Sequence, residues 1–123
     1  MKSVGLLVLR VGAGLMMAFA HGWGKMIKFQ EIAPRFPDPI GLGSHFSLGL
    51  AVFAEFFCSL LVVVGLFTRF AALNVVVTML VAAFVIHAAD PFAKKELALL
   101  YLLVFGTILI QGPGKYSAQE WLK

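Results

Sequence analysis

The sequence predicts an all-α integral membrane protein, a four-helix bundle with a long interfacial loop between its first and second helices. Composition is the first reason: 61% of the 123 residues are hydrophobic and only 13% are charged, against roughly 45–50% and 25% in soluble domains. The second reason is that the apolar residues form several runs close to the about 20 residues that cross a bilayer. The length predicts one domain over residues 1–123.

The run over residues 46–67 is the most informative of these, because a single acid, Glu55, interrupts it. Glu55 follows Phe46 by nine residues, which places it about 13 Å into the bilayer, near the midplane. An ionised acid at that depth costs about 2.5–3.5 kcal/mol on insertion scales. We therefore expect Glu55 to be either a functional group or one half of a structural ion pair.

The first helix is predicted over residues 3–24. Gly14, Ala18 and Gly22 recur at four-residue spacing and form a small-residue face that allows a neighbouring helix to approach closely. Arg10 and His21 are eleven residues apart, which at about 100° per residue returns to nearly the same face. One side of this helix thus carries both an arginine and a histidine.

Residues 23–44 form the long connection to the second helix. Pro34, Pro37 and Pro39 exclude a continuous helix there. Aromatic and apolar residues accompany the prolines, so we expect this loop to lie on the membrane surface or to cap the bundle.

The third and fourth helices are predicted over residues 70–87 and 96–111. Residues 65–69 leave room only for a tight turn, which makes the second and third helices antiparallel neighbours. Asn74 and Thr78 lie on a stripe suited to interhelical hydrogen bonds. A short tail helix is expected after residue 112, because Ser117 and Glu120 have the spacing of a capping box.

Four spans would place both termini on one side and the intervening loops on the other. All three histidines, His21, His45 and His87, then lie on the second side. Lys25, Asp90 and Glu96 lie on the same side. From helix rise alone, Arg10 and Glu55 would differ by roughly 6–8 Å in depth. We therefore predict an Arg10–Glu55 contact inside the bundle, either direct or through one intermediate group.

Charge does not fix the orientation, because four cations on the terminal side oppose five on the other. We assign both termini to the cytoplasmic side as an expectation. The basic residues form no stripe with stacking aromatics, so no nucleic acid is expected as a partner. Cys58 is the single cysteine, which excludes an intramolecular disulfide.

These patterns give a candidate site. The predicted catalytic residues are Glu55, His21 and His87, and the predicted ligand-binding residues are Arg10, Lys25, His45 and Glu96. A metal site made by the three histidines is an alternative, but no two of them have helical i, i+4 spacing, and no metal is predicted. Axial haem ligation by two histidines lacks a supporting motif.

A series of short motifs resembles the DoxX family of small bacterial membrane proteins. The motifs are Leu9-Arg10-Val-Gly12, His21-Gly-Trp-Gly-Lys25, Ala54-Glu55, Gly65-Leu-Phe-Thr-Arg69, His87, Glu96-Leu-Ala-Leu-Leu and Gly112-Pro-Gly-Lys-Tyr-Ser117. The resemblance implies a four-helix bundle in the bacterial cytoplasmic (inner) membrane. Members are commonly labelled oxidoreductases because the namesake is similar to a subunit of a thiosulfate:quinone oxidoreductase. An enzymatic role for this chain comes from that resemblance alone.

We therefore predict a membrane component of a quinone-linked oxidoreductase system, which binds an amphipathic small molecule near Glu55. The sequence has no flavin, nicotinamide or iron–sulfur motif, so electrons would come from a redox partner protein. The alternative is a non-catalytic membrane scaffold, or an assembly or chaperone partner of another complex. A lipid-like ligand in place of the quinone and a homo-oligomer are further expectations.

Overall fold

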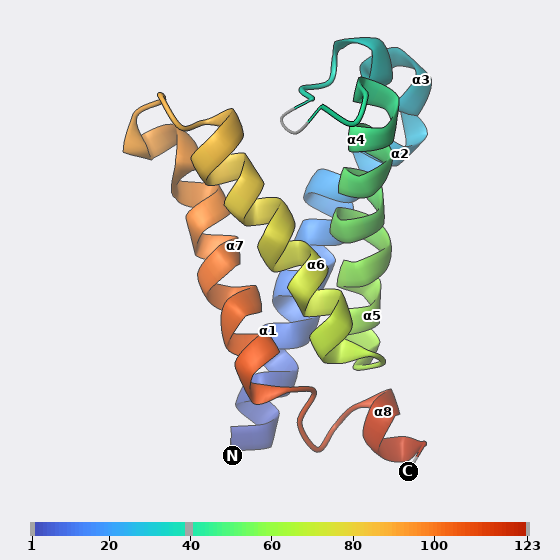
Figure 1. The fold of residues 1–123 in the computed structure, drawn as a ribbon. Coiled ribbons are helices and arrows are strands. Elements are labelled where there is room, and N and C mark those ends of the chain that lie inside the picture. The colour runs from blue at the N-terminus through green and yellow to red at the C-terminus, as the bar shows by residue number, and fades with distance from the viewer. Residues whose placement is uncertain (1, 39–40, 123) are drawn as a thin grey trace.

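The computed structural model describes residues 2–38 and 41–122, and within these ranges every regular element is a helix (Figure 1). This confirms the predicted all-α class. Four long helical runs pack side by side, and the N-terminal end of the first run lies at the same end of the molecule as the C-terminal tail (Figure 1).

The first two runs each contain a π-helical segment. The first run consists of α1 (Lys2–Met17), η1 (Ala18–Gly22) and α2 (Trp23–Ile27), and the second of α4 (Ser44–Val52), η3 (Phe53–Cys58) and α5 (Ser59–Val64). The first run thus extends beyond the predicted residue 24. The second ends earlier than the predicted residue 67, because Gly65 adopts a left-handed φ of 76° and caps the helix.

The third run consists of α6 (Thr68–Val81) and η4 (Ala82–Ile86), and the fourth is α7 (Phe92–Gln111). Only residues 65–67 separate α5 from α6, as the tight turn predicts, and the two helices pack together. α7 begins directly after Pro91, four residues before the predicted start at Glu96. The tail ends in α8 (Ala118–Trp121), where the Ser117 hydroxyl accepts a hydrogen bond from the Glu120 amide at 3.3 Å.

The four runs close into a ring. The first packs on the second and fourth, and the third packs on the second and fourth. A buried apolar cluster fills the centre; it includes Met17, Cys58, Val75, Met79, Tyr101 and Phe105. Cys58 is fully buried in this cluster as a small packing residue.

The predicted small-residue face of the first run forms the contact with the second run. A methyl group added at Gly14 would lie 2.9 Å from the backbone oxygen of Ser59, and one at Gly22 would lie 2.7 Å from the backbone nitrogen of Phe56. Such distances are too short for a side chain, so the two backbones approach as closely as glycine allows. The antiparallel contact fixes Gly22 opposite Glu55 and Phe56.

The connection between the first two runs, residues 28–43, is helical in part. It contains α3 (Phe29–Ile32) and η2 (Ala33–Arg35), which pack on α4 through Ala33, Leu48 and Val52. Asp38 then accepts hydrogen bonds from the amides of Leu42 and Gly43 at 2.9 and 3.0 Å. The connection therefore packs on the first part of the second run.

Among the described residues, three helical stretches are long and apolar enough to cross a membrane, namely Ser3–Ile27, Ser44–Val64 and Thr68–Ile86. α7 carries Lys94, Lys95 and Glu96 near its start, and its apolar part is residues 97–111. The chain is therefore a multi-pass, all-α membrane protein that associates with a lipid bilayer.

Candidate functional site

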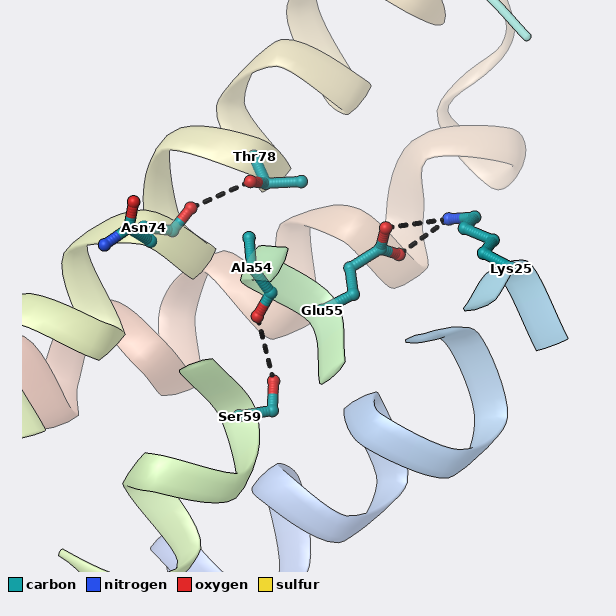
Figure 2. A network of polar contacts seen from close by, with 6 residues as sticks. All are labelled: Lys25, Ala54, Glu55, Ser59, Asn74 and Thr78. Atoms are coloured by element: carbon teal, nitrogen blue, oxygen red, sulfur yellow. Dashed lines mark hydrogen bonds and ion pairs between the residues drawn. The ribbon is translucent and has the colours of Figure 1, made fainter. Parts of the chain in front are cut away.

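A buried ion pair lies inside the bundle, between the first and second runs. The Lys25 ammonium is 2.7 Å from one carboxylate oxygen of Glu55 and 2.9 Å from the other (Figure 2). Glu55 is 3% exposed, and the Lys25 side chain is 30% exposed. Glu55 comes from η3 and faces inward, and Lys25 extends back from α2.

The predicted Arg10–Glu55 contact is wrong, because the partner of Glu55 is Lys25. Gly22 is fixed opposite Glu55, and Lys25 follows it by about one helical turn, within reach of a lysine side chain. Arg10 precedes Gly22 by twelve residues, or about 18 Å along the helix axis. The depths predicted for Arg10 and Glu55 depend on the ends of the spans alone, and they take no account of how the two helices are aligned along their axes.

Arg10 has a different role at the other end of the bundle. Its fully buried guanidinium donates hydrogen bonds to the backbone oxygens of Val62 (3.2 Å) and Val63 (3.4 Å), and also to that of Tyr116 in the tail. The last carbonyls of a helix lack partners within the helix. Arg10 therefore caps α5 and attaches the tail to it. It does not line the cavities beside Glu55, so it is not placed for the ligand-binding role that the sequence predicts.

A large cavity, which we call the α4–α6 groove, separates the second and third runs beside the ion pair. Its volume is about 350 Å³. The lining is mostly apolar and includes Leu50, Ala51, Phe53, Leu73, Val77 and Met79, with Lys25 and Glu55 as the charged residues. Leu73 and Val77 are 47% and 50% exposed, so the groove opens on the outer surface of the bundle.

Asn74 and Thr78 also line this groove, and they do not form the interhelical hydrogen bonds that the sequence predicts. The Asn74 amide donates to the Phe70 carbonyl at 2.9 Å. The Thr78 hydroxyl donates to the Asn74 carbonyl at 2.8 Å (Figure 2). Both bonds stay within α6, because the groove separates this face of α6 from α4. The stripe thus supplies polar atoms to the cavity wall.

A second cavity of about 190 Å³ lies on the other side of the ion pair, toward α7. We call it the mouth cavity; its lining includes Met17, His21, Lys25, Glu55, Met79, His87, Lys94 and Tyr101. The His21 ring packs edge-on against Tyr101, with ring centroids 5.3 Å apart and an interplanar angle of 87°. Lys25 and Glu55 therefore border both cavities.

The two predicted catalytic histidines line the mouth cavity, and His87 is held by an acid. Its Nδ1 lies 2.8 Å from a carboxylate oxygen of Asp90, three residues later in the turn before α7. This hydrogen bond, with the charges of His87, Lys94 and Lys95, lowers the pKa of Asp90 below its ordinary value. Asp90 is thus an acceptor for the Nδ1 proton, which leaves Nε2 of His87 for exchange.

Two predicted ligand-binding residues lie outside both cavities. His45 is exposed at the start of α4, and its ring faces Phe29 at a centroid distance of 6.5 Å. Glu96 is exposed on α7. The described residues contain no group of three or more His, Cys, Asp or Glu side chains that could hold a metal ion, and the helix arrangement separates His45 from the cavity that His21 and His87 share.

Tyr101 and Met79 also border the cavities, and neither is among the site residues that the sequence predicts. Tyr101 is 7% exposed and is a polar residue within the apolar part of α7. Its spacing from Lys94, Leu97 and Ala98 is that of one helix face, and all four residues line the mouth cavity. That periodicity, together with the isolated hydroxyl, is the pattern that could have identified it.

The arrangement can bind a molecule with an apolar part and a polar head. The groove would hold the apolar part, while Lys25 can donate hydrogen bonds and the Glu55 carboxylate can accept them. On its other side, the same carboxylate borders a cavity lined by two imidazoles and a phenol. The two imidazoles can exchange protons in the ordinary pH range of proteins.

A family model and a sequence relative match the chain. The family model described as DoxX matches residues 5–88, which include Lys25 and Glu55. An uncharacterized protein of Haemophilus influenzae is 30% identical over 129 residues, covering 99% of this chain and 85% of the relative. No solved structure matches the chain. The chain belongs to the DoxX family.

Proposed function

We propose that this protein is the membrane component of a quinone-linked oxidoreductase system, and that it binds an amphipathic small molecule with its head at Lys25 and Glu55. The observation that carries the proposal is the α4–α6 groove of about 350 Å³, which borders the buried ion pair. Its volume lies within the range of about 300–1,000 Å³ usual for small-molecule sites.

The lining of the groove fits a quinone. A quinone head presents carbonyl oxygens, to which the Lys25 ammonium can donate, and the quinol form presents hydroxyls, which the Glu55 carboxylate can accept. The partly exposed Leu73 and Val77 leave a lateral path for a hydrocarbon tail from the bilayer. Asn74 and Thr78 add polar atoms along the wall.

In this proposal the chain's residues bind the ligand and handle protons. Reduction of a quinone to a quinol takes up two electrons and two protons. A redox partner protein supplies the electrons, and Glu55 with a mouth histidine supplies protons. We place the chain in the bacterial inner membrane, which the family resemblance implies, with both termini on the cytoplasmic side.

Photolabelling of the full chain in nanodiscs tests the proposal. An azido-substituted benzoquinone with a decyl tail, reduced to its quinol form before illumination, should label peptides from residues 47–55 and 70–82, which line the groove. Glu55→Gln should reduce this labelling about tenfold, because the carboxylate acceptor is lost. Glu96→Gln is the matched control, since it removes an exposed carboxyl outside both cavities. Labelling spread over lipid-facing residues, or unchanged in Glu55→Gln, contradicts the proposal.

One observation favours the alternative of a non-catalytic scaffold or assembly partner. The Lys25–Glu55 pair is complete within the chain and lies where the first two runs are closest, so it can serve to hold these runs together. In that case, Glu55→Gln lowers the folded yield and the wild-type protein shows no groove labelling. Folded yield measured beside labelling separates the two functions.

A further inference from the structure

The mouth cavity has a composition unlike that of the groove. Its lining combines His21, His87 and Tyr101 with Lys94 at the rim, and it meets the ion pair from the side opposite the groove. With about 190 Å³ it has room for about six waters at ~30 Å³ each. A ligand in the groove and water in the mouth cavity would thus contact the same carboxylate from different sides.

We infer that the mouth cavity is a proton pathway, which connects the surface pair His87–Asp90 through His21 to the Glu55 carboxylate. The pathway rests on the proposed function, because the ligand in the groove is what receives the proton from Glu55. The inference separates two routes: an apolar molecule enters from the bilayer through the groove, and protons enter from water through the mouth.

The outer end of the pathway is His87. It lies in the turn between η4 and α7, and its side chain is 40% exposed while still lining the cavity. The contact between Nδ1 and Asp90 fixes the ring and assigns the proton on this nitrogen, which leaves Nε2 as the nitrogen that can accept a further proton. His87 can therefore take a proton from solvent and release it inward.

The inner end is His21, which η1 places beside the ion pair. The imidazole is within electrostatic range of both the Glu55 carboxylate and the Lys25 ammonium, and packing on Tyr101 holds the ring in the cavity. A proton transferred here leaves an imidazolium or a water and arrives on a carboxylate oxygen of Glu55, with no change in electron count.

The titratable groups that line the mouth cavity with Glu55 come from several elements. They are Lys25 from α2, His21 from η1, His87 after η4, and Lys94 and Tyr101 from α7, while α6 contributes the uncharged Met79. The positive charges of Lys25 and Lys94 repel further protons in the cavity. We therefore expect protons to pass one at a time and not to accumulate. His45 faces Phe29 outside this set.

Infrared spectroscopy after a rapid pH decrease tests the pathway without any ligand. The full chain is placed in nanodiscs, and the protonated Glu55 carboxyl band is assigned by its absence in Glu55→Gln. His87→Gln and His21→Gln should each slow the appearance of this band about tenfold and leave its final amplitude unchanged. His45→Gln, a histidine outside the cavity, should behave as wild type.

The inference is overturned if His87→Gln protonates Glu55 at the wild-type rate, or if the Glu55 band does not respond to pH. His87 is partly exposed in a turn, so its variant is expected to fold even if His21→Gln does not. Because the measurement contains no quinone, absent groove labelling refutes the proposed function alone, whereas an unchanged proton-uptake rate refutes the pathway alone.

Discussion

The ammonium of Lys25 lies 2.7 and 2.9 Å from the two carboxylate oxygens of Glu55, and both residues border two cavities of different character. On one side is a mostly apolar groove between α4 and α6, and on the other is a cavity lined by imidazoles and a phenol. The pair therefore lies where an apolar ligand and water can approach the same carboxylate.

Removing one member of the ion pair should destabilise the protein. Lys25→Met leaves the buried Glu55 carboxylate without its partner, and we expect a loss of about 1–3 kcal/mol in the free energy of unfolding. Breaking a fully buried ion pair usually costs about 3–5 kcal/mol. The expected loss is smaller here, because the Lys25 side chain is 30% exposed and water can replace part of the contact. Thermal unfolding in nanodiscs measures it.

The double variant Lys25→Met with Glu55→Gln completes a thermodynamic cycle. Since it removes both charges, it should lose less stability than the sum of the two single variants, with a coupling of about 0.5–3 kcal/mol. Lys28→Met, an exposed lysine three residues later, is the matched control. Additive losses in the cycle would mean that the observed contact contributes no coupling energy.

A methyl group at Gly22 should disrupt the contact between the first two runs. In Gly22→Ala the new Cβ lies 2.7 Å from the Phe56 nitrogen, so the backbones must separate at a cost of about 1–3 kcal/mol. Gly12→Ala is the control, because no atom lies within 4 Å of its added Cβ. It should be neutral or stabilising by up to about 1 kcal/mol. Equal unfolding temperatures for the two variants would contradict the close approach.

The all-α fold, the small-residue face and the tight turn before α6 could be predicted from the sequence. Each depends on a local pattern: hydrophobic runs, glycines and alanine at four-residue spacing, and a turn too short for anything but an antiparallel neighbour. The helix ends were less accurate. For example, α7 begins at Phe92, four residues before the predicted start at Glu96.

The site could be predicted only in part, because pairing across helices depends on register. Glu55, His21, His87 and Lys25 were identified as candidates, and the structure brings them to one region. The predicted partner of Glu55 was wrong, because Gly22 was interpreted only as a packing residue. Its close contact with Glu55 and Phe56 sets the register of the first run against the second. The π-helical turns η1 and η3 also shift the phase of each face, which a constant 100° per residue ignores.

Arg10 is expected to control attachment of the C-terminal tail. Arg10→Met removes the hydrogen bonds to Val62, Val63 and Tyr116, so the tail should detach from α5. Hydrogen exchange of the Gln119 amide, now bonded to the Gly65 oxygen at 3.0 Å, should accelerate about tenfold or more. Arg35→Met is the control, because Arg35 is exposed at the other end of the bundle. Unchanged exchange at Gln119 would contradict this role.

The His87–Asp90 contact predicts a dependence of stability on pH. The pKa of Asp90 is lowered in the folded state from an ordinary 3.8, chiefly by the His87 hydrogen bond. The folded state therefore gains stability from this group above about pH 3.8, and loses it as the pH falls through the lowered value. Wild type should unfold at a higher temperature than Asp90→Asn at neutral pH, and the difference should shrink in acid. A constant difference would rule out the linkage.

Filling the groove should abolish ligand binding without unfolding the protein. Val77 lines the α4–α6 groove and is 50% exposed, so Val77→Trp can occupy the cavity without displacing buried residues. We expect groove labelling by the azidoquinone to fall about tenfold or more, because the added indole takes the space of the quinone ring. Leu103→Trp is the matched control; Leu103 is 68% exposed on α7 and lines neither cavity. Similar labelling in the two tryptophan variants would show that the ligand binds elsewhere, because both add the same aromatic surface and only one blocks the groove.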